Sequence, residues 1–150
     1  MTAKNSAEAE MQPDQVEDGD GTRLSEIVRR GELLGGDCPS REILKHLTSR
    51  WGVLVLLALM QGAHRFAQLR RKVGGVSEKM LAQTLQTLEA DGFVHRKAYP
   101  VVPPHVEYTL TPLGLEAAEK VRDFADWIEV NIGRILKAGD GTRQVVSSDA

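Results

Sequence analysis

The side chains best suited to chemistry lie between Ser77 and Ala90, on one face of a predicted helix. At 100° per residue, Lys79, Gln83 and Gln86 lie together, opposite the apolar positions. A glutamine amide can pair with adenine through two hydrogen bonds, and a lysine ammonium can donate to guanine. A face that only meets water usually carries more charge, so the pattern favours contact with DNA base edges over a plain solvated helix.

The opposite face of this helix indicates how those side chains would be held. Leu81, Leu85 and Leu88 form one apolar stripe, which would anchor the helix to the body of the domain. Ser77 can act as the N-cap, and further polar and apolar side chains lie on the flanks. The candidate DNA contacts on this helix are Ser77, Lys79, Met80, Gln83, Gln86 and Thr87.

Basic side chains occur before and after this helix. Arg65 begins a short preceding helix, Arg70 and Arg71 end it, and Arg96 and Lys97 follow in a predicted strand. The period-two alternation of a strand places Arg96 on the face opposite Lys97. All five are candidate phosphate contacts, which set affinity and register but carry no sequence information directly.

The charge distribution along the chain agrees with a surface that binds a polyanion. The net charge of the 150 residues is -2, yet residues 38–97 carry ten Lys/Arg against four Asp/Glu. Residues 1–37 carry four against nine, and residues 98–150 carry five against eight. A basic segment between acidic flanks is typical of nucleic-acid binding, although a charge run can also be a solvated face.

Helices and a hairpin are predicted to position these residues. Apolar periodicity and capping residues predict, in order, a short helix from Pro39, an apolar helix over 50–61 capped by Ser49, a short helix over 66–73, a helix over 77–90, strands over 93–99 and 105–110, and a long helix from Pro112. The second of these helices is expected to be buried nearly all round. The order is that of an α+β winged helix-turn-helix, in which the second helix of the motif enters the DNA major groove and the hairpin forms the wing.

The segments outside this core have their own expected roles. Residues 1–21 are predicted to be an acidic disordered tail, residues 22–37 an N-terminal helix, and residues 138–150 a flexible tail. The N- and C-terminal helices carry more apolar surface than a domain of this size can cover, which indicates a homodimer. The candidate interface residues are Leu24, Ile27, Val28, Phe124, Trp127, Ile128, Ile132 and Ile135.

Residues 38–137 contain a run of short motifs, each weak alone and together specific. The motifs are Cys38-Pro39, Arg50-Trp51, Arg65-Phe66-X-X-Leu69, Val76-Ser77-X-Lys79-X-Leu81, Leu85-X-X-Leu88-Glu89-X-Asp91-Gly92, Tyr99-Pro100 and Val102-Pro103-Pro104-X-Val106-Glu107-Tyr108-X-Leu110-Thr111. Together they resemble the HxlR-type winged helix-turn-helix regulators of bacteria, with Ser49-Arg50 in place of the usual Gly-Lys. The resemblance implies a homodimeric transcription factor that responds to a chemical signal, often an oxidant or an electrophile.

Cys38 is the candidate sensor of such a signal. Pro39 is suited to the first position of a helix, so the Cys38 sulfur would face the positive end of the helix dipole, with Arg41 in the first turn. Both effects favour the reactive thiolate, whereas Asp37 opposes it, and a lone cysteine is most often a small buried hydrophobe. Two alternatives stay open. Either Cys38 senses the redox state, or Cys38 is structural and a small-molecule effector binds elsewhere.

Other chemistry has little support in the sequence. The four histidines lack the i, i+4 spacing of a helical metal site, and there is no phosphate-binding glycine loop and no G-x-S-x-G or H-E-x-x-H motif. We therefore expect no enzyme activity, no cofactor and no metal. The apolar run over residues 51–60 is about half of the ~20 residues that a membrane helix needs, and the single cysteine fits a cytoplasmic protein.

The expected function is sequence-specific binding of a double-stranded DNA operator by a homodimer that regulates transcription. The operator should be an inverted repeat, because a two-fold symmetric dimer presents two equivalent reading helices. The alternative is a winged helix that acts as a protein-interaction adaptor without DNA binding. Lys79, Arg70 and Arg96 around a Gln- and Thr-rich face argue against that alternative.

Overall fold

The computed structural model describes residues 35–36 and 38–148 of the chain. The tail predicted over residues 1–21 and the predicted dimerisation helix with Leu24, Ile27 and Val28 lie outside the described residues, so both stay predictions. The elements from Pro39 onward belong to one structural unit, which is distinct from Met1–Cys38.

Helices α2 (Pro39–Thr48) and α3 (Arg50–Leu59) open this unit and meet at Ser49. The Ser49 Oγ accepts a hydrogen bond from the Gly52 N–H at 3.1 Å, which confirms the predicted N-cap of α3. Gly52 also allows the two helices to approach closely, because a Cβ at this position would collide with the His46 carbonyl oxygen. A short polar junction thus joins two helices that pack directly on each other.

Helices α4 (Phe66–Lys72) and α5 (Glu78–Ala90) follow and form the predicted helix-turn-helix. The turn between them contains Gly75 at a φ of 86°, a conformation that residues with a Cβ rarely adopt. Ser77 is the N-cap of α5, since its side chain accepts a hydrogen bond from the Met80 N–H at 3.1 Å. The expected start and cap of this helix are therefore confirmed.

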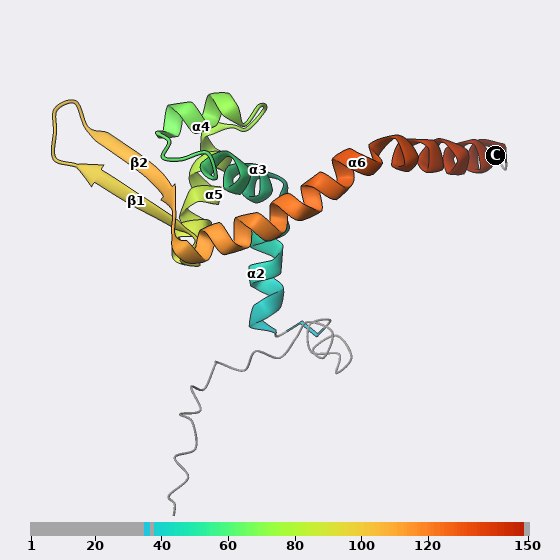
Figure 1. Cartoon of the computed structure of the whole chain (residues 1–150), viewed down its shortest axis with the longest axis horizontal. Coiled ribbons are helices and arrows are strands. Elements are labelled where there is room, and N and C mark those ends of the chain that lie inside the picture. Colours follow the sequence, from blue (N-terminus) through green and yellow to red (C-terminus); the bar gives the residue numbers. More distant parts are fainter. Residues whose placement is uncertain (1–34, 37, 149–150) are drawn as a thin grey trace, which may run out of the picture. The chain divides into compact units, whose positions relative to one another are not determined.

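Strands β1 (Val94–Tyr99) and β2 (His105–Leu110) pair antiparallel along their whole length, as expected, and form the wing. The segment before α4 joins the free edge of β2: the His64 N–H donates to the Tyr108 carbonyl at 3.0 Å, and the Tyr108 N–H donates back at 2.8 Å. In Figure 1 the hairpin projects away from the helices. In β1 only Val94 at the base is buried and the next four residues are exposed, whereas Tyr108 and Leu110 of β2 also pack against the core.

The core lies between α3, α4, α5, the base of the hairpin and the first turns of α6 (Pro112–Ser148). Its fully buried large side chains are Val55, Leu56, Leu69, Leu81, Leu85 and Leu88. The expectation that α3 is buried nearly all round is wrong at Leu54, which is 38% exposed. The elements that pack on α3 leave that side of the helix open to solvent.

Helix α6 starts at the foot of the hairpin and extends beyond the other elements of the unit (Figure 1). Its start packs tightly, because a Cβ at Gly114 would collide with the Phe93 carbonyl oxygen. Within the described residues, no helix is both long and apolar enough to cross a membrane.

The C-terminal end of α6 differs from the expectation. We expected the helix to give way to a flexible tail over residues 138–150, whereas α6 continues to Ser148. Adding residues to an existing helix needs no new nucleus, and this stretch contains no proline, so the two glycines at 139 and 141 weaken the helix without ending it. The flexibility of this end stays a prediction.

Candidate nucleic-acid interface

Helix α5 has a fully buried face and a polar exposed face. Leu81, Leu85 and Leu88 are 0%, 2% and 1% exposed and pack in the core. Lys79, Gln83 and Gln86 are exposed on the other side. The side chains expected to read bases are therefore presented together to solvent, on a helix that its leucines hold rigidly.

The start of α5 uses two of its side chains for internal hydrogen bonds. The Ser77 Oγ accepts from the Met80 N–H, so only its O–H remains to donate to a phosphate. The Thr84 hydroxyl donates to the Met80 carbonyl at 2.7 Å, which keeps this side chain against its own helix. Ser77 thus caps α5, and only its hydroxyl proton remains for the predicted DNA contact.

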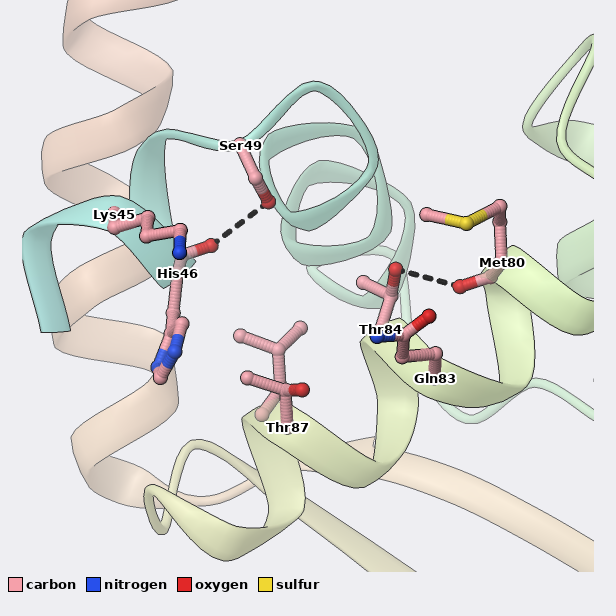
Figure 2. Close-up of a pocket in the computed structure, with 8 residues that line it drawn as sticks. Lys45, His46, Ser49, Met80, Gln83, Thr84 and Thr87 are labelled. Carbon is pink, nitrogen blue, oxygen red and sulfur yellow. Dashed lines mark hydrogen bonds between the residues drawn. The ribbon is translucent and has the colours of Figure 1, made fainter. Parts of the chain in front are cut away.

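A hollow lies on each flank of α5. The flank toward α2 and α3 has a hollow of about 230 Å³, which Figure 2 shows between Lys45, His46 and Ser49 on one side and Met80, Gln83, Thr84 and Thr87 on the other. The flank toward the wing has a second hollow, of about 350 Å³, lined by Ala82, Gln86, Glu89, Arg96 and Tyr108. Predicted reading residues line both hollows, so the whole width of α5 is accessible.

The wing carries its two cations on opposite faces, as the strand alternation predicts. Arg96 faces α5 across the second hollow. The Lys97 ammonium instead lies 4.8 Å from the centre of the Tyr99 ring, on the outer face of the hairpin. Of these two cations, Arg96 is therefore the one that faces the predicted reading surface.

The outer face of the wing is organised around Glu107. The Tyr99 hydroxyl donates to Glu107 Oε2 at 3.0 Å, and His105 Nε2 lies 2.8 Å from Glu107 Oε1. The Tyr99 and His105 rings also meet edge to face at 4.9 Å. The hydrogen bond from His105, followed by that from Tyr99, lowers the pKa of Glu107 from its ordinary value. This cluster was not predicted from the sequence. Residues 97, 99, 105 and 107 nevertheless alternate along two paired strands, which indicates that they share one face of the hairpin.

The predicted phosphate contacts on α4 are all exposed but not equally available. The Arg70 guanidinium forms an ion pair with Glu78 Oε1 at 2.8 Å, whereas Arg71 is exposed on the same helix. Arg65 is the exposed N-cap residue of α4, with its backbone N–H donating to Gln68 Oε1 at 2.8 Å. An exposed ion pair contributes about 0–1 kcal/mol, so a phosphate can displace Glu78 from Arg70.

A hydrogen bond that the sequence did not suggest ties α2 to the end of α5. His46 Nδ1 lies 2.6 Å from Asp91 Oδ2, and the two side chains are 26% and 14% exposed. Glu42 Oε2 lies 3.7 Å from the other ring nitrogen of His46. The partners are 45 residues apart in the chain, so no local pattern could have revealed the contact.

The candidate dimer residues on α6 share one side of the helix and are largely exposed. Phe124, Trp127, Ile132 and Ile135 are 61%, 54%, 42% and 39% exposed, and Ile128 is half-buried. Steps of three and four place Phe124, Ile128, Ile132 and Ile135 on one stripe, with Trp127 at its edge. This stripe begins where α6 leaves the core.

Cys38 is a free, partly exposed thiol immediately before the first residue of α2. That position matches the predicted one at the start of this helix. Among the residues that the structure describes, no group of three His, Cys, Asp or Glu side chains could hold a metal ion.

Comparison with known proteins places this geometry in a family. The model of the HxlR-like helix-turn-helix family matches residues 46–135. The HTH-type transcriptional regulator YtfH of Escherichia coli (strain K12) is 64% identical over 117 residues, which cover 78% of this chain and 93% of that protein.

Solved structures agree with this assignment. The structure of the transcriptional regulator YtfH of Salmonella typhimurium is 64% identical, with a TM-score of 0.69 over 72% of this chain and 96% of that one. The redox regulator HypR in its reduced form is 33% identical, with a TM-score of 0.62 over 66% of this chain and 98% of that one. The resemblance seen in the sequence is confirmed, and so is the expectation that the protein is not an enzyme. The chain belongs to the HxlR-like helix-turn-helix family and is a transcriptional regulator of the helix-turn-helix type.

Proposed function

We propose that this regulator binds a specific DNA operator and reads its sequence through the exposed face of α5. The observation that carries the proposal is the division of α5 into two faces. Three leucines are at most 2% exposed, while Lys79, Gln83 and Gln86 lie together in solvent. Two uncharged amides and one ammonium match the donors and acceptors of base edges in the major groove.

The protein acts as a homodimer in this proposal, and α6 supplies the interface. The apolar stripe of Phe124, Ile128, Ile132 and Ile135 is a patch of the kind that marks protein interfaces. The predicted N-terminal helix with Leu24, Ile27 and Val28 would add to it. A two-fold axis places the two copies of α5 about one DNA turn (~34 Å) or a multiple apart, so the operator is an inverted repeat.

A protein-interaction adaptor without DNA binding is the competing function. It would be favoured by an apolar or acidic reading face on α5, whereas the face formed by Lys79, Gln83 and Gln86 carries two amides and one cation. Exposed Arg71 on α4 and Arg96 on the wing add positive charge on either side. Binding to phosphates accounts for that charge more directly than binding to an apolar partner.

Equilibrium binding distinguishes the two functions. The full chain is titrated by fluorescence anisotropy against a duplex from the DNA upstream of its own gene and against the same duplex with its base order shuffled. We expect a preference of ~10³-fold or more for the upstream duplex. Equal, weak binding to both duplexes would favour the adaptor.

We further propose that Cys38 senses an oxidant or electrophile. Support comes from the redox regulator HypR, from the exposure of the thiol and from its place at the start of α2. Because the chain has one cysteine, a disulfide could form only between two subunits or with a small thiol. Diamide should change the operator affinity of the wild type and not of Cys38→Ser. An equal response of both proteins would instead indicate a small-molecule effector bound elsewhere.

A further inference from the structure

The geometry points to Lys45 as a DNA phosphate contact on the flank of α5 opposite the wing. This inference rests on the proposed operator binding and adds a subsite to it. Lys45 lies in α2, outside the helix-turn-helix and the wing, and neither the sequence analysis nor the family resemblance identifies it as a DNA contact.

The width of the major groove requires phosphate contacts on both sides of α5. A helix with its side chains is about 10–12 Å across, and the major groove is about 12 Å wide. A reading helix therefore fills the groove, and the phosphates of the two strands lie along its two flanks. Arg96 faces one flank across the hollow beside the wing. The other flank is the hollow lined by Lys45 and Ser49.

The hollow beside Lys45 opens onto the reading surface. Gln83 and Thr87, both predicted to contact bases, line it together with Lys45 (Figure 2). DNA that lies on α5 would therefore cover its mouth and bring a backbone phosphate next to the ammonium. The hydroxyls of Ser49 and Thr84 already donate to the His46 and Met80 carbonyls, so they do not compete with Lys45 as donors.

Lys45 supplies a positive charge at the edge of the hollow. Within the described part of the chain, none of the ion pairs involves Lys45. The acidic groups nearby are Glu42, one turn earlier on α2 and 67% exposed, and Asp91 at the end of α5. Both carboxylates lie beside His46, with Glu42 Oε2 3.7 Å and Asp91 Oδ2 2.6 Å from its ring nitrogens.

His46 also fixes the position of Lys45. Its side chain lies 2.6 Å from Asp91, the C-cap of α5, and therefore joins the last turn of α2 to the reading helix. Lys45 is the preceding residue in that turn. The distance between the Lys45 backbone and the reading surface is thus set by a direct link between the two helices.

The test compares Lys45→Gln with wild type in the full chain, on the upstream and shuffled duplexes, over a range of salt concentrations. The proposed dimer carries two copies of Lys45, so the change removes two phosphate contacts. It should lower the steepness of log K against log salt by about 1.8 and weaken binding to both duplexes by the same factor. Lys45→Arg should restore the slope. Lys137→Gln, the same change at an exposed site of α6, is the control and should leave it unchanged.

The outcomes separate this inference from the proposed function. If wild type binds the upstream duplex preferentially and Lys45→Gln keeps both slope and affinity, Lys45 makes no phosphate contact while operator binding stands. If wild type binds neither duplex, the proposed function fails and this inference with it. Equal thermal unfolding of the variants and wild type shows that any change in slope comes from the lost charge.

Discussion

Helices α5 and α6 both carry an apolar stripe, but only the stripe of α5 is covered. Leu81, Leu85 and Leu88 on α5 are at most 2% exposed, whereas Phe124 and Ile132 on α6 are 61% and 42% exposed. Both helices are amphipathic, so the sequence pattern alone does not separate them. The difference lies in what each stripe meets, which is the core for α5 and, among the described residues, solvent for α6.

In the proposed function, this difference gives the two helices different partners. The apolar residues of α5 pack in the core, so only the polar face of this helix is exposed to a partner that forms hydrogen bonds. The distal part of α6 offers an apolar surface, which a second copy of the same helix matches. In the proposed function, α5 therefore reads DNA and α6 sets the spacing between the two copies of α5.

A substitution in the buried apolar stripe of α5 should lower the free energy of unfolding more than any other change considered below. Leu85→Ala removes a fully buried side chain and should lower the free energy of unfolding by about 2–5 kcal/mol. Urea denaturation of this variant and of its exposed neighbour Gln86→Ala measures the contrast. A loss below about 1 kcal/mol for Leu85→Ala would mean that α5 is not anchored as described.

A smaller effect, on assembly, is expected from the exposed stripe. Ile132→Asp places a charge in the proposed interface and should weaken the dimer by more than about 2 kcal/mol, since central apolar contacts dominate interface energies. Val130→Asp is the matched control, because Val130 is 84% exposed on the opposite side of α6. Sedimentation at micromolar concentration should show a monomer for Ile132→Asp and a dimer for the control. A dimer for both variants would place the interface elsewhere.

The smallest of these expected effects is the pH dependence of the Glu107 cluster on the wing. Hydrogen bonds from His105 and Tyr99 hold the pKa of Glu107 below 4.5 in the folded protein. The stabilisation from this carboxylate is therefore present above the unfolded pKa of about 4.5 and is lost as the pH falls through the lower folded value. An NMR titration of the Glu107 carboxyl should show a midpoint below 4.5, which Tyr99→Phe should raise. A wild-type midpoint at or above 4.5 would contradict the described hydrogen bonds.

Local signals in the sequence predicted the elements and much of the proposed reading surface. Ser77 followed by an apolar period defined α5 and its exposed face, and the alternation in β1 separated Arg96 from Lys97. The contacts between distant segments could not be predicted in this way. The His46–Asp91 pair, the hollow beside Lys45 and the link from Arg70 to Glu78 depend on how α2, α4 and α5 pack, and no periodicity encodes that packing.

If the exposed face of α5 reads DNA sequence, Gln83→Ala should change which DNA the protein prefers. Gln83 is uncharged and exposed, so its loss does not change the attraction to phosphates. We expect a loss of about 1–3 kcal/mol per operator half-site in binding to the upstream duplex and almost none to the shuffled duplex. Arg96→Ala, in contrast, should weaken both alike and lower the salt dependence. Equal losses on the two duplexes for Gln83→Ala would contradict the claim that α5 reads bases.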